Sequence, residues 1–192
     1  MKIAIIKYNA GNIMSVDYAL QRLGVKAEIT DDQETIRKAD KVIFPGVGEA
    51  STAMKYLREH KLNVLIRDLR QPVLGICIGL QLMCAHSEEG NVDCIGIFPN
   101  RIKLFKPSLK VPHMGWNTLT GVKTKLLEGC ENQYVYFVHS YYAETGNFTI
   151  ATTDYINPFS SALHKDNFYA TQFHPEKSGL VGSRILENFI KL

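Results

Sequence analysis

The sequence has no long hydrophobic run, and this absence bounds what the protein does. No apolar stretch among its 192 residues approaches the roughly 18 that a membrane-spanning helix needs. The apolar start within residues 1–7 is also too short for a signal peptide, and it predicts a first buried strand. We therefore expect a cytoplasmic protein that has no contact with a membrane.

Cysteine pairing patterns are missing as well. Cys77, Cys84, Cys94 and Cys130 form no CxxC pair and show no metal-ligand spacing with histidine. This argues against both a zinc site and a secreted disulfide framework. We expect a protein from a reducing compartment, with no metal ion and no cofactor.

The chain also lacks a strong excess of charge of one sign. The formal net charge is +3, which is too small to indicate nucleic-acid binding. The basic residues Arg101, Lys103 and Lys106 interleave with apolar ones. Such alternation is typical of the solvated face of a half-buried strand.

Strand-like and helix-like segments alternate through the first half of the chain. Asn12 is suited to cap a helix over residues 13–23, and Gly24 is placed to end it. Strands are predicted at residues 2–7, 25–30, 41–44 and 72–76, a turn at 8–12, and further helices through 38, at 49–60 and at 78–85. This alternation indicates crossover connections and a parallel sheet covered on both faces.

The second half is richer in strands. They are predicted around residues 95–105, 134–138, 148–153, 160–164 and 169–173, before a closing helix at 179–191. No repeat, low-complexity tract or long linker divides the chain. We expect one α/β domain over residues 1–192, with a mostly parallel central sheet flanked by helices and additional antiparallel strands in the second half.

The most informative motif is Gly75-Ile76-Cys77-Ile78-Gly79, between an expected strand and an expected helix. It is the G-x-S-x-G nucleophile elbow with cysteine in place of serine. Glycines at both ends relieve steric crowding in a tight turn that lifts the sulfur above the sheet. A helix N-terminus at this point favours thiolate over thiol. Taken alone, the motif also fits a small buried cysteine.

A histidine and a carboxylate follow another expected strand. His174 and Glu176 lie two residues apart after residues 169–173. On an extended backbone they would project to the same side, so that the carboxylate orients the imidazole for proton transfer with Cys77. Each of these residues has a common structural role by itself, but the three together indicate nucleophilic catalysis.

Acyl transfer also needs donors for the developing oxyanion. The backbone N–H of Ile78, directly after the nucleophile, is one candidate. Gly48 closes the segment 45–48, at the end of what is expected to be a neighbouring parallel strand, and could supply a second. A plain turn remains the alternative for that segment.

These motifs resemble the class I (triad) glutamine amidotransferases over essentially the whole chain. The elbow, followed by Leu80-Gln81, and Gln172-Phe173-His174-Pro175-Glu176 carry the resemblance to the superfamily. Further segments resemble the glutaminase subunits of imidazole glycerol phosphate synthases. They are Tyr8-Asn9-Ala10-Gly11-Asn12, Pro45-Gly46-Val47-Gly48, Ser87-Glu88-Glu89-Gly90, Val111-Pro112-His113-Met114-Gly115-Trp116-Asn117, Phe137-Val138-His139-Ser140-Tyr141-Tyr142 and His174-Pro175-Glu176-Lys177-Ser178.

The resemblance implies that glutamine is hydrolysed through a Cys77 thioester. It places Gln81, Glu89, Ser140 and Tyr141 around the substrate, with the Glu89 carboxylate facing the substrate ammonium; a solvated acidic turn is the alternative for Glu89.

The resemblance also implies a heterodimer with a (β/α)₈-barrel cyclase subunit. This partner uses the ammonia to form imidazole glycerol phosphate and aminoimidazole carboxamide ribotide in histidine biosynthesis. Trp116, Asn117 and Lys177 match residues near that subunit. A buried position is the alternative for Trp116, the single tryptophan.

Three other functions remain open at this level. A paralogue could feed ammonia to a different synthase that aminates a sugar or nucleotide precursor. A stand-alone γ-glutamyl hydrolase would use the same cysteine elbow without a partner. A flavodoxin-like binding module with a redox-sensing cysteine would leave His174 and Glu176 without a role.

Overall fold

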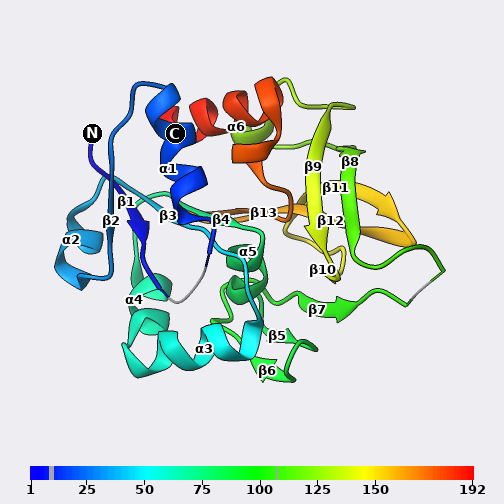
Figure 1. Ribbon diagram of the computed structural model, residues 1–192, viewed down its shortest axis with the longest axis horizontal. Coiled ribbons are helices and arrows are strands. Elements are labelled where there is room, and N and C mark those ends of the chain that lie inside the picture. The colour runs from blue at the N-terminus through cyan, green and yellow to red at the C-terminus, as the bar shows by residue number, and fades with distance from the viewer. Residues whose placement is uncertain (9–10, 107) are drawn as a thin grey trace.

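A seven-stranded sheet forms the centre of the protein (Figure 1). The computed structural model describes residues 1–8, 11–106 and 108–192, so the predicted turn at 8–12 lies partly outside the described residues. The strand order is β11-β12-β13-β4-β3-β1-β2. Neighbours from β13 to β2 run parallel, whereas β11 and β12 are antiparallel additions at one edge. The predicted fold class is confirmed.

Short apolar strands alternate with helices in the first half, as the sequence predicts. The strands are β1 (Ile3–Ile6), β2 (Ala27–Thr30), β3 (Lys41–Phe44) and β4 (Val73–Ile76). The helices are α1 (Ile13–Arg22), α2 (Gln33–Lys38), α3 (Ala50–Glu59), α4 (Leu62–Asp68) and α5 (Ile78–Met83). Gly24, with φ of 74°, ends α1 through a backbone hydrogen bond to Gln21, which confirms the predicted stop signal.

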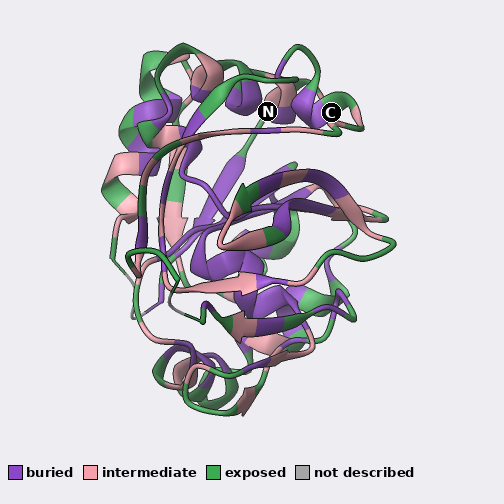
Figure 2. Cartoon of the chain, turned by 90° about the vertical axis from the view of Figure 1, so that its right-hand side faces the viewer, coloured by how far each residue is buried: buried purple, intermediate pink, exposed green. Residues whose placement is uncertain are grey.

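Helices cover both faces of the central sheet and bury two apolar clusters. Strand residues alternate between the faces: Ile3 and Ile5 pack with α1 and α6 (Gly179–Lys191), whereas Ala4 and Ile6 pack with α2, α3 and α4. The strands β1, β3 and β4 are buried at every position, and Figure 2 shows exposed residues on the outer sides of the helices. Burial on both sides explains why these strands read as continuous apolar runs.

The second half adds strands beyond the central sheet. β12 (Asn157–Lys165) and β13 (Phe168–Thr171) extend the sheet next to β4, and β11 (Thr149–Tyr155) closes that edge. β8 (His113–Thr118) pairs with β9 (Tyr134–His139) in a separate two-stranded ribbon. A four-stranded sheet contains β5 (His86–Ser87), β6 (Val92–Asp93), β7 (Arg101–Leu104) and β10 (Tyr141–Ala143).

Several predicted boundaries are wrong. The strand predicted over residues 95–105 is limited to β7, because residues 95–100 bend around the end of α5 through backbone bonds such as Ile95 N–H to the Leu82 carbonyl. Within β7, Ile102 is buried, but Leu104 is 45% exposed, so the solvated face is less regular than the alternation predicts. Helix α4 and strands β5, β6, β8 and β10 are not predicted at all.

No helix in the described parts of the chain is long and apolar enough to cross a membrane.

Candidate active site

Cys77 stands on a strained turn between β4 and α5. Its φ and ψ are 55° and −108°, in a region that non-glycine residues seldom adopt. A β-carbon at Gly79 would lie 2.0 Å from the Phe44 carbonyl oxygen, and one at Gly75 would lie 2.6 Å from Met83 Sδ. The two glycines therefore allow α5 to start directly beneath the cysteine, as the elbow motif predicts.

A cavity of about 310 Å³ opens beside this turn. It gathers seven of the predicted site residues from four parts of the chain. They are Gly48, Cys77, Ile78, Gln81, Glu89, Ser140 and Tyr141. Val47, Pro112, Val138 and His139 complete the lining. Gly48 has a φ of 145°, a conformation that favours glycine, and it lines the same cavity as Ile78. Their role as a pair of oxyanion donors stays a prediction.

His174 and Glu176 form a fully buried pair. The His174 Nδ1 and Glu176 Oε1 atoms are 2.7 Å apart, and both side chains are 0% exposed. The two residues meet, but not by strand alternation, so that part of the prediction is wrong. β13 ends at Thr171, and Pro175 begins a 3₁₀ turn, Pro175–Lys177, that brings the carboxylate back to the imidazole.

The backbone of His174 is fixed from two sides. Its N–H donates to the Tyr136 carbonyl at 3.0 Å, and its carbonyl accepts from Ser178 Oγ at 2.6 Å. Ser178 in turn accepts from the Tyr136 N–H at 3.0 Å. Gly182 allows α6 to approach, since a β-carbon there would lie 1.9 Å from the Pro175 carbonyl oxygen. The imidazole is therefore presented by β9 and α6 together.

The surroundings of His174 favour its protonated form. Burial is the largest influence and lowers the pKa, but the nearby Cys77 and Glu176 outweigh it and raise the pKa to about 10. Nε2 of His174 is buried and accepts or donates no hydrogen bond within the described residues. This nitrogen is the one left to exchange a proton, because Nδ1 is held by the carboxylate.

Asn12 contacts the same carboxylate, which corrects its predicted role. It occupies the N-cap position of α1, but with φ of 69° and ψ of 5° its side chain makes no cap. Its Nδ2 donates instead to Glu176 Oε1. The Glu176 oxygen thus receives hydrogen bonds from two side chains. A capping pattern in the sequence cannot reveal this, because the partner lies 164 residues further along the chain.

Glu89 lies at the start of α3, where its Oε2 accepts from the Ala50 N–H at 2.8 Å. Burial raises its pKa, the Ala50 hydrogen bond opposes this, and the nearby Glu49 carboxylate adds to it. Glu49 is the N-cap of α3 and accepts from Ser51 and Thr52, whose hydrogen bonds lower its pKa to about 2. Glu89 is half-buried and lines the cavity, and its contact with the substrate ammonium stays a prediction.

Gln81 lies 4% exposed beneath the cavity and is part of a side-chain network. Its Nε2 donates to the Tyr141 carbonyl and to Gln172 Oε1, each at 3.0 Å. Gln172 belongs to a motif that carries the family resemblance, but the sequence predicts no role for it. Its Nε2 lies 3.8 Å from Cys77 Sγ, within the range for a hydrogen bond to sulfur. Substrate binding by Gln81, Ser140 and Tyr141 stays a prediction.

The three residues predicted at a partner interface lie on the surface near the ribbon. Trp116 is 55% exposed, which excludes the alternative of a buried core tryptophan, and its ring meets Tyr136 edge-on at 5.9 Å. Lys177 is exposed on the 3₁₀ turn after His174, and Asn117 is half-buried on β8. Their contact with a partner stays a prediction.

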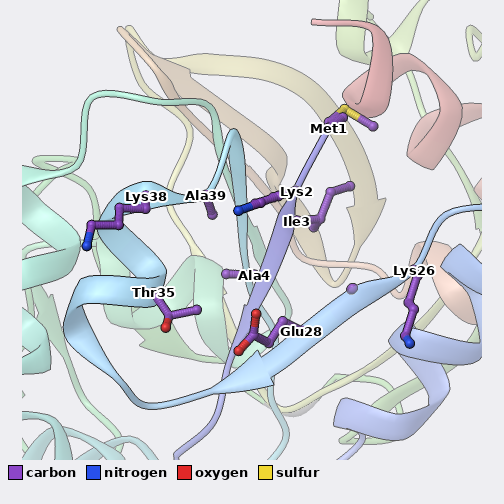
Figure 3. A pocket seen from close by; sticks show the side chains of 10 residues that line it. Met1, Lys2, Ile3, Ala4, Lys26, Glu28, Thr35, Lys38 and Ala39 are labelled. Carbon is purple, nitrogen blue, oxygen red and sulfur yellow. The ribbon is translucent and has the colours of Figure 1, made fainter.

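A larger hollow of about 550 Å³ lies elsewhere, between β1, β2 and α2 (Figure 3). Its lining includes Lys2, Lys26, Glu28 and Lys38 but no cysteine or histidine. Figure 3 shows Lys26 and Lys38 at opposite sides of it, so the cations do not converge on one point. The smaller cavity at Cys77 is therefore the candidate active site.

A cysteine on a nucleophile elbow, with a carboxylate-bound histidine held nearby, is typical of enzymes that hydrolyse amides through a thioester. Residues 4–192 match the family Glutamine amidotransferase class-I, and the chain belongs to this family.

Curated relatives extend the likeness over the full length. The chain is 64% identical to the imidazole glycerol phosphate synthase subunit HisH of Bacteroides fragilis, covering 100% of both chains over 196 residues. It is 63% identical to the HisH subunit of Bacteroides thetaiotaomicron, with the same coverage. It is 47% identical to that of Archaeoglobus fulgidus, over 99% of this chain and 98% of the relative.

Solved structures share the fold at low sequence identity. A putative GMP synthase component from Thermoplasma acidophilum superposes with a TM-score of 0.76 at 21% identity, covering 100% of this chain and 92% of the other. The structure of PurLQS from Thermotoga maritima gives a TM-score of 0.74 at 14% identity, over 99% and 97% of the two chains. These likenesses show the fold alone.

Proposed function

We propose that this protein is the glutaminase subunit of an imidazole glycerol phosphate synthase and releases ammonia from glutamine for histidine biosynthesis. The full-length identity of 64% with a HisH subunit supports the assignment to this branch of the family. The observation that carries the catalytic part is the single cavity in which Cys77, Gly48, Ile78 and Glu89 meet, with the pair of His174 and Glu176 held nearby.

In the proposed reaction, Cys77 Sγ attacks the side-chain amide carbon of glutamine. The backbone N–H groups of Ile78 and Gly48 stabilise the oxyanion that forms. His174 Nε2 gives a proton to the leaving nitrogen, the C–N bond breaks, and ammonia departs from a glutamyl thioester. A water molecule then loses a proton to His174, attacks the thioester and releases glutamate. Glu89 faces the ammonium of the substrate.

Ammonia needs an acceptor before it meets bulk water, because at neutral pH it becomes ammonium and loses the lone pair that attacks. We place the acceptor site on a (β/α)₈-barrel cyclase subunit that covers the face carrying Trp116, Asn117 and Lys177. An exposed tryptophan beside a tyrosine is the kind of residue that anchors an interface. Control of the resting activity through a peptide at Gly48 that reorients when the partner binds is part of the proposal.

The catalytic part is tested by Cys77→Ala. Glutamate formation is measured with the purified chain, a candidate barrel subunit, and the ligand of that barrel. We expect the rate to fall by at least about 10³-fold, because removal of a nucleophile leaves only the binding groups. Cys84→Ala is the matched control, since Cys84 is buried near the end of α5 and away from the cavity lining. Full activity of Cys77→Ala would refute every catalytic role assigned here.

The partner is tested by Trp116→Ala in a binding titration with the barrel subunit. We expect the dissociation constant to rise by about 30-fold, since anchoring aromatics contribute roughly 2 kcal/mol or more. Val64→Ala is the control, because Val64 is 43% exposed on α4, apart from the ribbon. Equal glutaminase rates with and without the ligand-loaded partner would favour a stand-alone hydrolase instead.

A further inference from the structure

A chain of side-chain hydrogen bonds ends on the sulfur of Cys77. It starts at the Tyr141 carbonyl, which accepts from Gln81 Nε2 at 3.0 Å. The same nitrogen donates to Gln172 Oε1 at 3.0 Å, and Gln172 Nε2 reaches Cys77 Sγ at 3.8 Å. Gln172 is 0% exposed and Gln81 4% exposed, so water does not compete for these amides.

The carbonyl end of the chain decides which atom of Gln172 faces the sulfur. A backbone carbonyl only accepts hydrogen bonds, so Gln81 must turn its nitrogen toward Tyr141. That nitrogen is also the neighbour of the Gln172 amide, which must therefore present its oxygen to Gln81. The amide nitrogen of Gln172 is then left to point at Cys77.

The backbone of Gln172 holds this arrangement in place. Its N–H donates to the Ser161 carbonyl on β12 at 2.8 Å, directly after β13 ends at Thr171. Cys77 is tied to the same strand end, because its N–H donates to the Thr171 carbonyl at 2.8 Å. The donor and the sulfur thus share one rigid support.

We propose that Gln172 is a further catalytic residue: its side-chain N–H donates to Cys77 Sγ and stabilises the thiolate that attacks the substrate. Gln81 acts as a positioning residue, because it fixes the orientation of the Gln172 amide. A donated hydrogen bond is stronger to a charged acceptor than to a neutral one, so it favours thiolate over thiol. This inference rests on the function proposed above, in which Cys77 is the nucleophile.

The test is the pH dependence of Cys77 alkylation by iodoacetamide in the full chain, read at each cysteine by peptide mass spectrometry. Gln172→Glu keeps the shape of the side chain but places a carboxylate beside the sulfur. In this variant we expect iodoacetamide to alkylate Cys77 about tenfold more slowly at neutral pH, with the pH profile of alkylation displaced to higher pH by about one unit. Gln172→Leu, which only removes the donor, is expected to give a smaller displacement in the same direction.

Two controls separate this effect from general damage. Asn100→Asp makes the same amide-to-carboxylate change at a buried residue, 8% exposed, whose amide donates to the Glu144 carbonyl. It should leave the Cys77 profile unchanged. Cys94, half-buried and with a pKa raised by burial to about 12, is the internal reference for unfolding in each sample.

An unchanged Cys77 profile in a folded Gln172→Glu protein overturns the proposal. If that variant unfolds, which fast alkylation of Cys94 reports, Gln172→Leu decides in the same way. Alkylation needs neither glutamine nor a partner. A displaced profile in a chain without glutaminase activity would therefore refute the proposed function alone, and an unchanged profile in an active enzyme would refute only the role of Gln172.

Discussion

Two buried histidine pairs lie close to the candidate active site, and they differ in charge. His174 is 0% exposed and contacts Glu176 at 2.7 Å, and its pKa is raised to about 10. His139 is 6% exposed and contacts His113 at 3.1 Å, and burial lowers its pKa to about 3. Burial acts in the same direction on both rings. We infer that the Glu176 carboxylate, together with Cys77, favours a proton on His174 that His139 lacks.

The pair of His113 and His139 can form all its hydrogen bonds with both rings neutral. The Tyr141 carbonyl accepts from His139 Nδ1 at 2.8 Å, which leaves His139 Nε2 to accept from His113 Nδ1. Nε2 of His113 then accepts from Asn117 Nδ2 at 3.4 Å. These tautomers follow from the partners, and burial lowers the pKa of His113 to about 4. The charge of His174 further lowers the pKa of His139.

The largest effect is expected when His174 loses its contact with the Glu176 carboxylate, because the difference in pKa between His174 and His139 should then shrink. In Glu176→Gln we expect the pKa of His174 to fall from about 10 toward that of His139, since the hydrogen bond and charge of Glu176 both raise it. Glutamine hydrolysis should fall by about 10³- to 10⁴-fold, as for other triads whose carboxylate becomes an amide. The rate with partner and the NMR titration of the imidazole measure both effects.

The matched control is Glu187→Gln, which makes the same change at an exposed position of α6. Its rate should stay within about twofold of the unmodified protein. A Glu176→Gln rate within tenfold would show that the carboxylate is not what sets His174 apart from His139.

The two pairs should affect the pH dependence of the free energy of unfolding in opposite directions. In the folded protein the pKa values of His113 and His139 lie below the unfolded value of 6.5, at about 4 and about 3. The stability that depends on their neutral rings is therefore present above pH 6.5 and is lost as the pH falls toward these values. His174 has the opposite sign, and its contribution is lost as pH rises through about 10. We expect the free energy of unfolding, measured with urea, to be about 1 to 3 kcal/mol lower at pH 5 than at pH 7.

His113→Phe sharpens this result. Phenylalanine keeps the stacking of ring 113 on Tyr155, at 4.0 Å, but cannot titrate. We expect the loss of stability between pH 7 and 5 to shrink by roughly half, because one of the two depressed histidines is gone. His60→Phe, at an exposed histidine that also stacks at 4.0 Å, on Tyr56, is the control for replacing a stacked histidine by phenylalanine. An equal slope in His113→Phe would contradict our assignment.

The smallest effect is expected at the surface end of the neutral pair. Asn117→Ala removes the long contact to His113 and a hydrogen bond of 3.0 Å to the Asp154 carbonyl. Because Asn117 is only half-buried, water can replace it, and thermal unfolding should report a loss of at most about 1 kcal/mol. Thr120→Ala is the control for losing a hydroxyl bond at the same edge of β11, 3.1 Å from the Thr152 carbonyl. A loss above about 2 kcal/mol would indicate that Asn117 supports the whole histidine chain.

Much of the candidate site was predictable because its determinants are local. Cys77 sits between two glycines whose absence of a side chain is required by contacts of 2.0 and 2.6 Å, so the pattern itself encodes the turn. Helix α4 was predictable too but missed, although Leu62, Leu65, Ile66 and Leu69 show the i, i+3, i+4, i+7 spacing of a buried helical face. The short strands β5 and β6 were not predictable, because a strand of two residues is too short to show a hydrophobic alternation.

By itself, the sequence determined the alternating α/β order, the cysteine elbow and the presence of a histidine and a glutamate two residues apart. These depend on side-chain period, steric size and neighbouring positions along the chain. Only the tertiary structure decided that Asn12 donates to Glu176, that Gln172 faces Cys77, and that the two histidine pairs differ in charge. Such contacts join residues about 90 or more positions apart, or depend on burial, and neither is visible to local spacing.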